Sequence, residues 1–211
     1  IAVDMAQTHP MNRLLQGDVG SGKTIVAGYA MLLTVAHGHQ AAIMAPTEIL
    51  ARQHLATFND LLSASHVRIA LLTGALTGSE REHVVQQLAA GSIDIVVGTH
   101  AVLSEDVQFA KLGLVVIDEQ HKFGVRQRAR LKQSGLDPHY LVMTATPIPR
   151  TVAMTVFGDL TVSTLRDHPP GRQAIHTYLP TGSERQKWWD FVCRKLCEGR
   201  QGYIVAPLID E

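Results

Sequence analysis

The sequence predicts an α/β fold in which a parallel sheet is flanked by helices. Short apolar runs alternate with longer helical stretches over most of the chain, and this alternation is typical of βαβ units. A glycine-rich segment, 17–24, follows the first apolar run, and the later run 115–117 ends in two acids. Buried parallel strands deliver polar groups to the carboxyl edge of a sheet in this way.

The elements of this sheet follow from the same pattern. Strands are expected at 12–16, 40–45, 68–72, 93–98, 112–117 and 139–143. Helices are expected in the gaps, near 23–37, 48–63, 79–90, 125–133 and 150–157. The first strand ends at the glycine-rich segment, and the apolar stretch 24–33 predicts the buried helix that should follow it. Pro147 and Pro149 favour an extended exit from the last strand.

The alternation stops near 167–172, where Pro169, Pro170 and Gly171 predict a stiff, non-helical linker. We expect a first domain over 1–165, a linker over 166–174 and the incomplete start of a second α/β domain over 175–211. Within that last part, a strand is expected at 174–179, a helix at 184–198 and a strand at 202–207. Because the chain opens inside a helical pattern and stops just after an apolar run, we expect it to be a fragment.

The segment 17–24 is a complete phosphate-binding loop of the form G-x-x-x-x-G-K-[ST]. Its glycines let backbone N–H groups approach phosphates closely. Lys23 is expected to reach the β- and γ-phosphates, and the Thr24 hydroxyl to bind Mg²⁺. The alternative is a glycine-rich turn that only joins a strand to a helix. The candidate nucleotide-binding residues are Gly17, Asp18, Val19, Gly20, Ser21, Gly22, Lys23 and Thr24.

Two acids end the apolar strand near 112–117. Asp118 is expected to hold Mg²⁺ opposite Thr24, and Glu119 to accept a proton from the water that attacks the γ-phosphate. The alternative is a pair of ordinary surface acids. Gln120 and His121 follow, and such groups can sense the γ-phosphate and pass its loss to another part of the protein. His121 could instead be a hydrogen-bonded core histidine.

Two threonines, Thr144 and Thr146, follow the next strand within the segment 143–150. Parallel strands end at one edge, so these hydroxyls are expected beside Asp118 and Glu119. The alternative is a turn whose hydroxyls are incidental.

Composition excludes several classes of protein. The 211 residues are 45% hydrophobic and 18% charged, which describes neither a disordered nor a fibrous chain. No apolar run approaches a membrane span, and the first residues lack the charged n-region and apolar h-region of a signal peptide. The only two cysteines, Cys193 and Cys197, provide no disulfide framework, so a cytoplasmic location without a membrane partner is expected.

A formal net charge of zero gives no general attraction to nucleic acid. Local patches would have to supply it. The clearest is 121–132, which carries five Lys or Arg residues and no acid. It is either a solvated helix face or a surface that contacts phosphates or another domain.

The motifs resemble, in order, those of superfamily 2 helicases and translocases. They read GDVGSGKT (17–24), APTEILARQ (45–53), TG (73–74), GTHA (98–101), DEQH (118–121) and TATPIPRT (144–151). The longer segments, with PPGR at 169–172, look like those of the RecG-type ATP-dependent DNA helicases. The transcription-repair coupling translocases are the alternative, but they typically read DEEH where this chain has Gln120.

The resemblance implies that the first domain is a RecA-like motor lobe that uses ATP and Mg²⁺. Lys23, Asp118 and Glu119 would be catalytic, with Thr24 and Asp118 as the metal ligands. Gln120, His121, Thr144 and Thr146 would couple hydrolysis to motion. Other residues would contact the DNA backbone, since contacts to phosphate position a strand without reading its sequence. They are Pro46, Thr47, Glu48, Thr73, Gly74, Thr99 and His100.

The resemblance also implies partners and an activity. The partners would be branched or forked DNA, together with the second motor lobe and the wedge domain of a full-length chain. The activity would be unwinding of stalled forks and Holliday junctions in recombination and repair. The family's adenine-reading motif and arginine finger lie outside these 211 residues, so the isolated chain is expected to hydrolyse ATP poorly.

Two other classes of function compete with this interpretation. A P-loop kinase or transporter ATPase is disfavoured by the threonine segment after the acidic strand. A catalytically silent P-loop interaction module is disfavoured by the intact Lys23, Thr24, Asp118 and Glu119.

Overall fold

A computed structural model of the chain describes residues 1–118, 137–146, 160–166 and 176–205. The strands are β1 (Asn12–Gly17), β2 (Gln40–Met44), β3 (Ile69–Leu72), β4 (Ile95–Gly98), β5 (Leu112–Asp118), β6 (His139–Thr144) and β7 (Thr161–Leu165). The helices are α1 (Ala2–Met5), α2 (Lys23–Ala36), α3 (Glu48–Leu61), α4 (Gly78–Ala89), the 3₁₀-helix η1 (His100–Leu103) and α7 (Arg185–Cys197). The predicted helices 125–133 and 150–157 lie outside the described residues.

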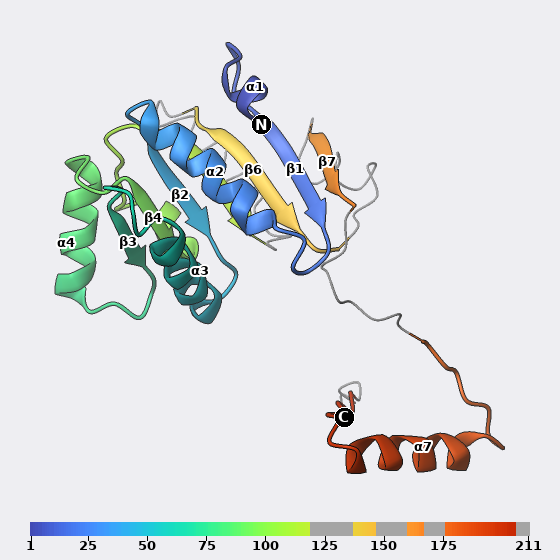
Figure 1. Cartoon of the computed structure of the whole chain (residues 1–211). Coiled ribbons are helices and arrows are strands. Elements are labelled where there is room, and N and C mark those ends of the chain that lie inside the picture. Colours follow the sequence, from blue (N-terminus) through green and yellow to red (C-terminus); the bar gives the residue numbers. More distant parts are fainter. Residues whose placement is uncertain (119–136, 147–159, 167–175, 206–211) are drawn as a thin grey trace. The chain divides into compact units, whose positions relative to one another are not determined.

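The strands form one seven-stranded sheet in the order β3-β4-β2-β5-β6-β1-β7. Every pairing in it is parallel, so the carboxyl ends of all strands lie along a single edge (Figure 1). The predicted fold class is confirmed, and each of the six predicted strands is present to within two residues.

The strand β7 was not predicted. It reads Thr-Val-Ser-Thr-Leu and lies at the end of the sheet, beside β1. Two of its five residues, Thr161 and Thr164, are exposed. An edge strand half open to solvent needs no continuous apolar run, and therefore it gives no strong signal in the sequence.

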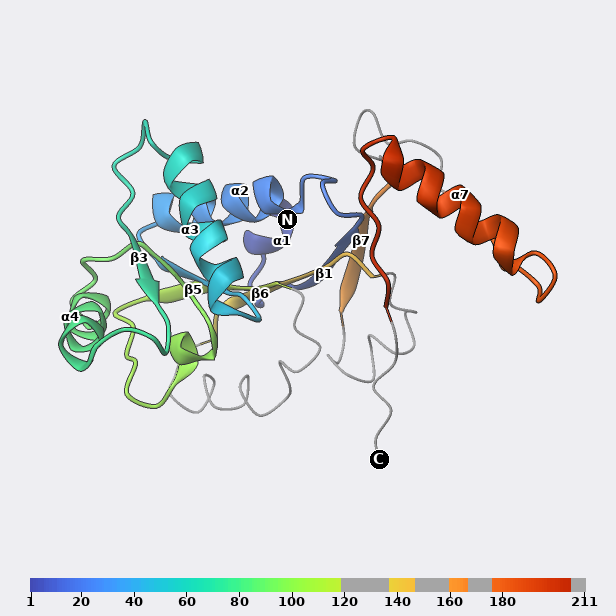
Figure 2. The ribbon, with the colours of Figure 1, turned by 90° about the horizontal axis from the view of Figure 1, so that it is seen from below.

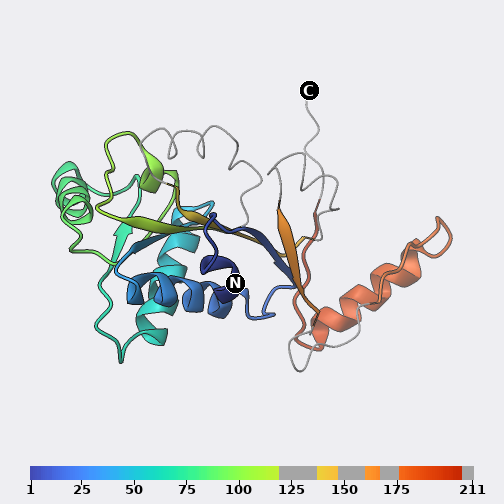
Figure 3. The ribbon, with the colours of Figure 1, turned by 90° about the horizontal axis from the view of Figure 1, so that it is seen from above.

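Both faces of the sheet are buried. Neighbouring residues of one strand, such as Leu14 and Leu15, belong to different core clusters. The cluster on one face contains Ala27 of α2 and Phe58 of α3, and Figures 2 and 3 show these two helices on the same side of the sheet. The other cluster contains Leu88 of α4. This two-sided burial explains why the central strands are apolar throughout.

The chain divides into two compact units, 1–170 and 171–211. In the second unit α7 matches the predicted helix 184–198, and none of its residues is buried. The predicted strands 174–179 and 202–207 are wrong for the residues that the structure describes, 176–179 and 202–205, which belong to no strand. A strand needs a neighbour to pair its backbone, and the described residues of this unit provide none. The predicted domain boundaries stay a prediction.

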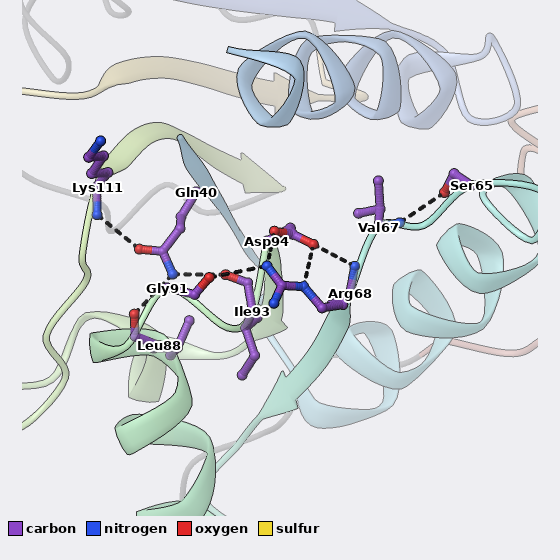
Figure 4. Close-up of polar contacts among 9 residues, drawn as sticks. All are labelled: Gln40, Ser65, Val67, Arg68, Leu88, Gly91, Ile93, Asp94 and Lys111. Atoms are coloured by element: carbon purple, nitrogen blue, oxygen red, sulfur yellow. Dashed lines mark hydrogen bonds and ion pairs between the residues drawn. The ribbon is translucent and has the colours of Figure 1, made fainter. Parts of the chain in front are cut away.

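At the amino ends of the strands, one buried side chain ties several elements together. Gln40, 5% exposed, opens β2. Its Nε2 donates to the carbonyls of Leu88 (3.0 Å) and Ile93 (2.8 Å), and its Oε1 accepts from the N–H of Lys111 (3.0 Å), as Figure 4 shows. These bonds join β2 to the end of α4 and to the loops that enter β4 and β5.

A second contact in Figure 4 joins the entries of β3 and β4. The Asp94 carboxylate accepts from the Arg68 backbone N–H (2.8 Å), from Nε (2.9 Å) and from Nη2 (2.7 Å). The side-chain hydrogen bond from Arg68 holds the pKa of Asp94 below its ordinary value of 3.8, although burial opposes that shift.

The Gln40 bonds can be tested by Gln40→Leu. The substitution leaves two carbonyls and one N–H without their partner, so we expect the free energy of unfolding to fall by about 2–4 kcal/mol. Urea denaturation measures it. Gln86→Leu, at an exposed position on α4, is the matched control and should change stability by less than about 0.5 kcal/mol. Equal effects of the two variants would contradict the role of Gln40.

The Asp94 contact predicts a pH dependence of stability. Because the pKa of Asp94 is lowered in the folded state, its contribution is present above about pH 3.8 and is lost as the pH falls through the folded value. That contribution is at most about 1 kcal/mol, since Arg68 is largely exposed. Asp94→Asn should therefore lower stability at neutral pH and flatten the acid limb of a urea-midpoint titration. An unchanged acid limb would contradict the prediction.

Candidate functional site

The phosphate-binding loop connects β1 to α2. Gly20 and Gly22 have φ of 78° and 91°, a left-handed conformation that glycine adopts without penalty. Gly22 is the N-cap of α2, and its carbonyl accepts from the N–H groups of Ile25 (3.0 Å) and Val26 (3.2 Å). The N–H groups at the start of α2 are thus directed at the loop, an arrangement that favours anions.

The Lys23 ammonium lies across this loop. Its Nζ donates to the carbonyls of Gly17 (2.7 Å) and Asp18 (2.9 Å). Gly17 has no room for a side chain, since an added Cβ would lie 2.5 Å from Ser21 Oγ. The Ser21 Oγ is buried and has no hydrogen-bond partner within the described ranges. A cation, an unsatisfied hydroxyl and helix N–H groups gathered in one loop fit a bound polyphosphate.

The strand order brings the predicted coupling residue beside this loop. The strand β6 lies between β1 and β5, with Thr144 in register with Gln16, and Met143 in register with Asp118. Thr144 is 2% exposed. Its Oγ1 accepts from the N–H of Thr146 (3.1 Å) and lies 2.9 Å from the Thr146 hydroxyl. The two predicted threonines therefore form one turn at the end of β6.

Asp118 ends β5, one strand further along. Its Oδ2 is 2.7 Å from His54 Nε2, and the two side chains are 13% and 11% exposed. His54 comes from α3 and was not predicted as a site residue. A single histidine on an amphipathic helix carries no signal, and the contact joins residues 64 apart in the sequence. Glu119, Gln120 and His121 lie outside the described residues.

The predicted DNA-contacting residues follow β2, β4 and the edge strand β3. Thr47 is exposed and caps α3, where its Oγ1 accepts from the N–H of Leu50 at 3.3 Å. Gly74 and His100 are exposed as well. Thr73 differs, because it is fully buried and its Oγ1 has no partner among the described residues. The assignment of these residues to DNA stays a prediction.

The sheet edge is thus divided into two halves. The phosphate loop, Thr144 and Asp118 follow β1, β6 and β5, which are adjacent in the sheet. Segments 46–48, 99–100 and 73–74 follow β2, β4 and β3, which are also adjacent. Within one edge, the nucleotide candidates and the nucleic-acid candidates form two separate groups.

Among the residues that the structure describes, no three His, Cys, Asp or Glu side chains gather into a metal-binding group. Mg²⁺ commonly needs only one or two carboxylates, with substrate phosphates and water completing its shell. Thr24 and Asp118 suit that mode of binding. No helix in the described part of the chain has the length and apolar character needed to cross a membrane.

Comparison with known proteins identifies the class. Residues 2–155 match the DEAD/DEAH box helicase family, and the chain belongs to that family. Over its whole length it is 50% identical to the ATP-dependent DNA helicases RecG of Synechocystis sp. and Bacillus subtilis. It spans 25% and 31% of those two proteins.

Solved structures agree with this similarity. The structure of RecG bound to a three-way DNA junction matches 98% of this chain with a TM-score of 0.81 and 47% identity, and the match covers 28% of that protein. The DUF1998 helicase MrfA matches with a TM-score of 0.61 at 20% identity, which shows the fold alone. The resemblance to RecG-type helicases is confirmed.

Gly98→Ala tests how closely the candidate nucleic-acid segments are packed. An added Cβ would lie 1.9 Å from the Leu72 carbonyl oxygen and 2.5 Å from Val102 Cγ2, so β3 and β4 would have to separate. We expect a loss of about 3 kcal/mol or more in the free energy of unfolding. Gly78→Ala, where nothing lies within 4 Å, is the control and should be neutral or stabilising. A Gly98→Ala loss below about 1 kcal/mol would refute this packing.

Proposed function

We propose that this chain carries the ATP- and Mg²⁺-binding part of a DNA helicase that acts on branched DNA in recombination and repair. The observation that carries the proposal is the shared edge of β1, β6 and β5, which holds the phosphate loop, Thr144 and Asp118. The RecG bound to a three-way junction supports the choice of DNA as substrate.

Each residue of the candidate site would have a separate role in ATP hydrolysis. Lys23 and the loop amides would hold the phosphates, and Thr24 and Asp118 would ligate Mg²⁺, which supplies charge stabilisation when bound. Glu119 would take the proton of the attacking water. Thr144 and Thr146 share a hydrogen-bonded turn, so a shift of one would move the other and could pass hydrolysis on as motion.

DNA would lie along the other half of the edge. Thr47, Gly74 and His100 present surface there, and contacts to the phosphate backbone would grip a strand without reading its sequence. Alternate closing and opening of this lobe against a second lobe would convert hydrolysis into translocation. The working compartment would be the cytoplasm.

Lys23→Ala in the full-length protein tests the nucleotide site. We expect ATP turnover, measured with and without a three-way DNA junction, to fall by about 10²-fold or more, because a cation that stabilises developing charge is removed. Junction affinity should change by less than about threefold, since Lys23 lies on the nucleotide half of the edge. Lys111→Ala, at an exposed position, is the matched control.

The outcomes separate the candidate functions. Turnover retained by Lys23→Ala would overturn the site assignment. Wild-type protein that binds the junction but hydrolyses no ATP would instead be a catalytically silent P-loop module. Turnover stimulated equally by linear duplex and by branched DNA would favour a double-stranded DNA translocase of the transcription-repair coupling type.

A further inference from the structure

A histidine that belongs to none of the predicted motif roles contacts the carboxylate of the candidate Mg²⁺ site. His54 Nε2 lies 2.7 Å from Asp118 Oδ2. The two side chains are only 11% and 13% exposed, so water competes little for this hydrogen bond. An ionised carboxylate only accepts hydrogen bonds, and therefore the imidazole donates from Nε2.

The contact engages one oxygen of a carboxylate that has two. A carboxylate whose oxygen is held by a neighbouring donor cannot rotate freely about its Cβ–Cγ bond. Partners of this kind fix the orientation of a metal-binding group and commonly change metal affinity by about 10–100-fold when they are removed. His54 is placed to do this for Asp118.

The imidazole itself is held in place by the core. It stacks on Phe58, one turn further along α3, with ring centroids 6.0 Å apart and ring planes 16° apart. Phe58 is fully buried, and α2 approaches it at Gly28, where an added Cβ would lie 3.4 Å from Phe58 Cε1. The helix that carries Lys23 and the helix that carries His54 are thus packed together.

The position of His54 within α3 adds a second link. This helix is capped by Thr47, a predicted DNA-contacting residue, and His54 lies about two turns further on. The helix α3 therefore links a predicted DNA-contacting residue at its start to Asp118 on the nucleotide half of the sheet edge. We propose that His54 is a positioning residue that orients the Asp118 carboxylate for Mg²⁺ and fastens it to α3. This inference rests on the function proposed above.

A merely structural role for His54, as a polar bond between α3 and β5, would change stability without changing Mg²⁺ affinity. The test therefore measures binding of the cation in the full-length protein. Mn²⁺, in place of Mg²⁺, is titrated by electron paramagnetic resonance in the presence of saturating ADP. The Mg²⁺ concentration that gives half-maximal ATP turnover is measured in parallel.

Three substitutions are compared. His54→Met keeps the volume and removes the donor, and we expect Mn²⁺ affinity to fall by about 10–100-fold. His54→Asn keeps a polar side chain that is too short to reach Asp118, so the same loss is expected even if His54→Met fails to fold. His54→Gln places an amide N–H near the position of Nε2 and should restore affinity to within about threefold of wild type. His66→Met, at an exposed loop position, is the control.

Wild-type affinity in His54→Asn, or an equal loss in His54→Gln and His54→Asn, would overturn the inference. ADP binding without a divalent cation should stay unchanged in all variants, which separates the effect on the metal from an effect on the nucleotide.

Asp118→Asn distinguishes failure of the inference about His54 from failure of the proposed Mg²⁺ site. If Asp118→Asn abolishes Mn²⁺ binding and the His54 variants do not alter it, only the inference fails. If Asp118→Asn also leaves binding unchanged, the proposed Mg²⁺ site itself fails.

Discussion

Parallel pairing of every strand is the constraint on which the site depends. Because the strands all run in one direction, the segments that follow them must emerge at the same edge. The backbone register then sets which segments are neighbours, with Thr144 beside Gln16 and Met143 beside Asp118. A slip of one residue would turn each side chain to the opposite face of the sheet. Backbone hydrogen bonds that have no chemical role of their own thus decide which side chains meet.

The core supports this register because few of its buried side chains are polar. Thr34, Gln40, Thr73 and Thr144 are the buried polar side chains among the described residues. Gln40 lies at the amino end of its strand and has its hydrogen-bonding groups satisfied. Thr73 and Thr144 follow or end strands at the carboxyl edge, where the candidate site lies. Of these four, only Thr73 leaves a buried oxygen without a described partner, and a polar group left in that way is costly in a purely structural position.

The sequence was most informative where a pattern has one physical cause. Apolar runs buried on both faces predicted β1 to β6, and the glycine-rich segment 17–24 predicted the loop between the first strand and the buried helix that follows it. The sequence was least informative where the structure of a segment depends on another segment, distant in the sequence, that pairs with it or packs against it. The strand β7 exists because β1 pairs with it, whereas the apolar segment 202–205 is no strand because it pairs with nothing described. His54 was missed for the same reason, since only the folded chain brings α3 to the end of β5.

The edge strand β7 has a mechanical consequence. It pairs with β1 along its full length, from Thr161 opposite Arg13 to Leu165 opposite Gly17, and then the chain continues to the second unit. A tension applied to the chain beyond 165 and directed along β7 would load the hydrogen bonds between the two parallel strands in shear, all at once. Such an attachment resists force far better than one in which bonds open singly. Since Gly17 ends β1 and begins the candidate phosphate loop, β1, which shares this load with β7, is also the strand that leads into that loop.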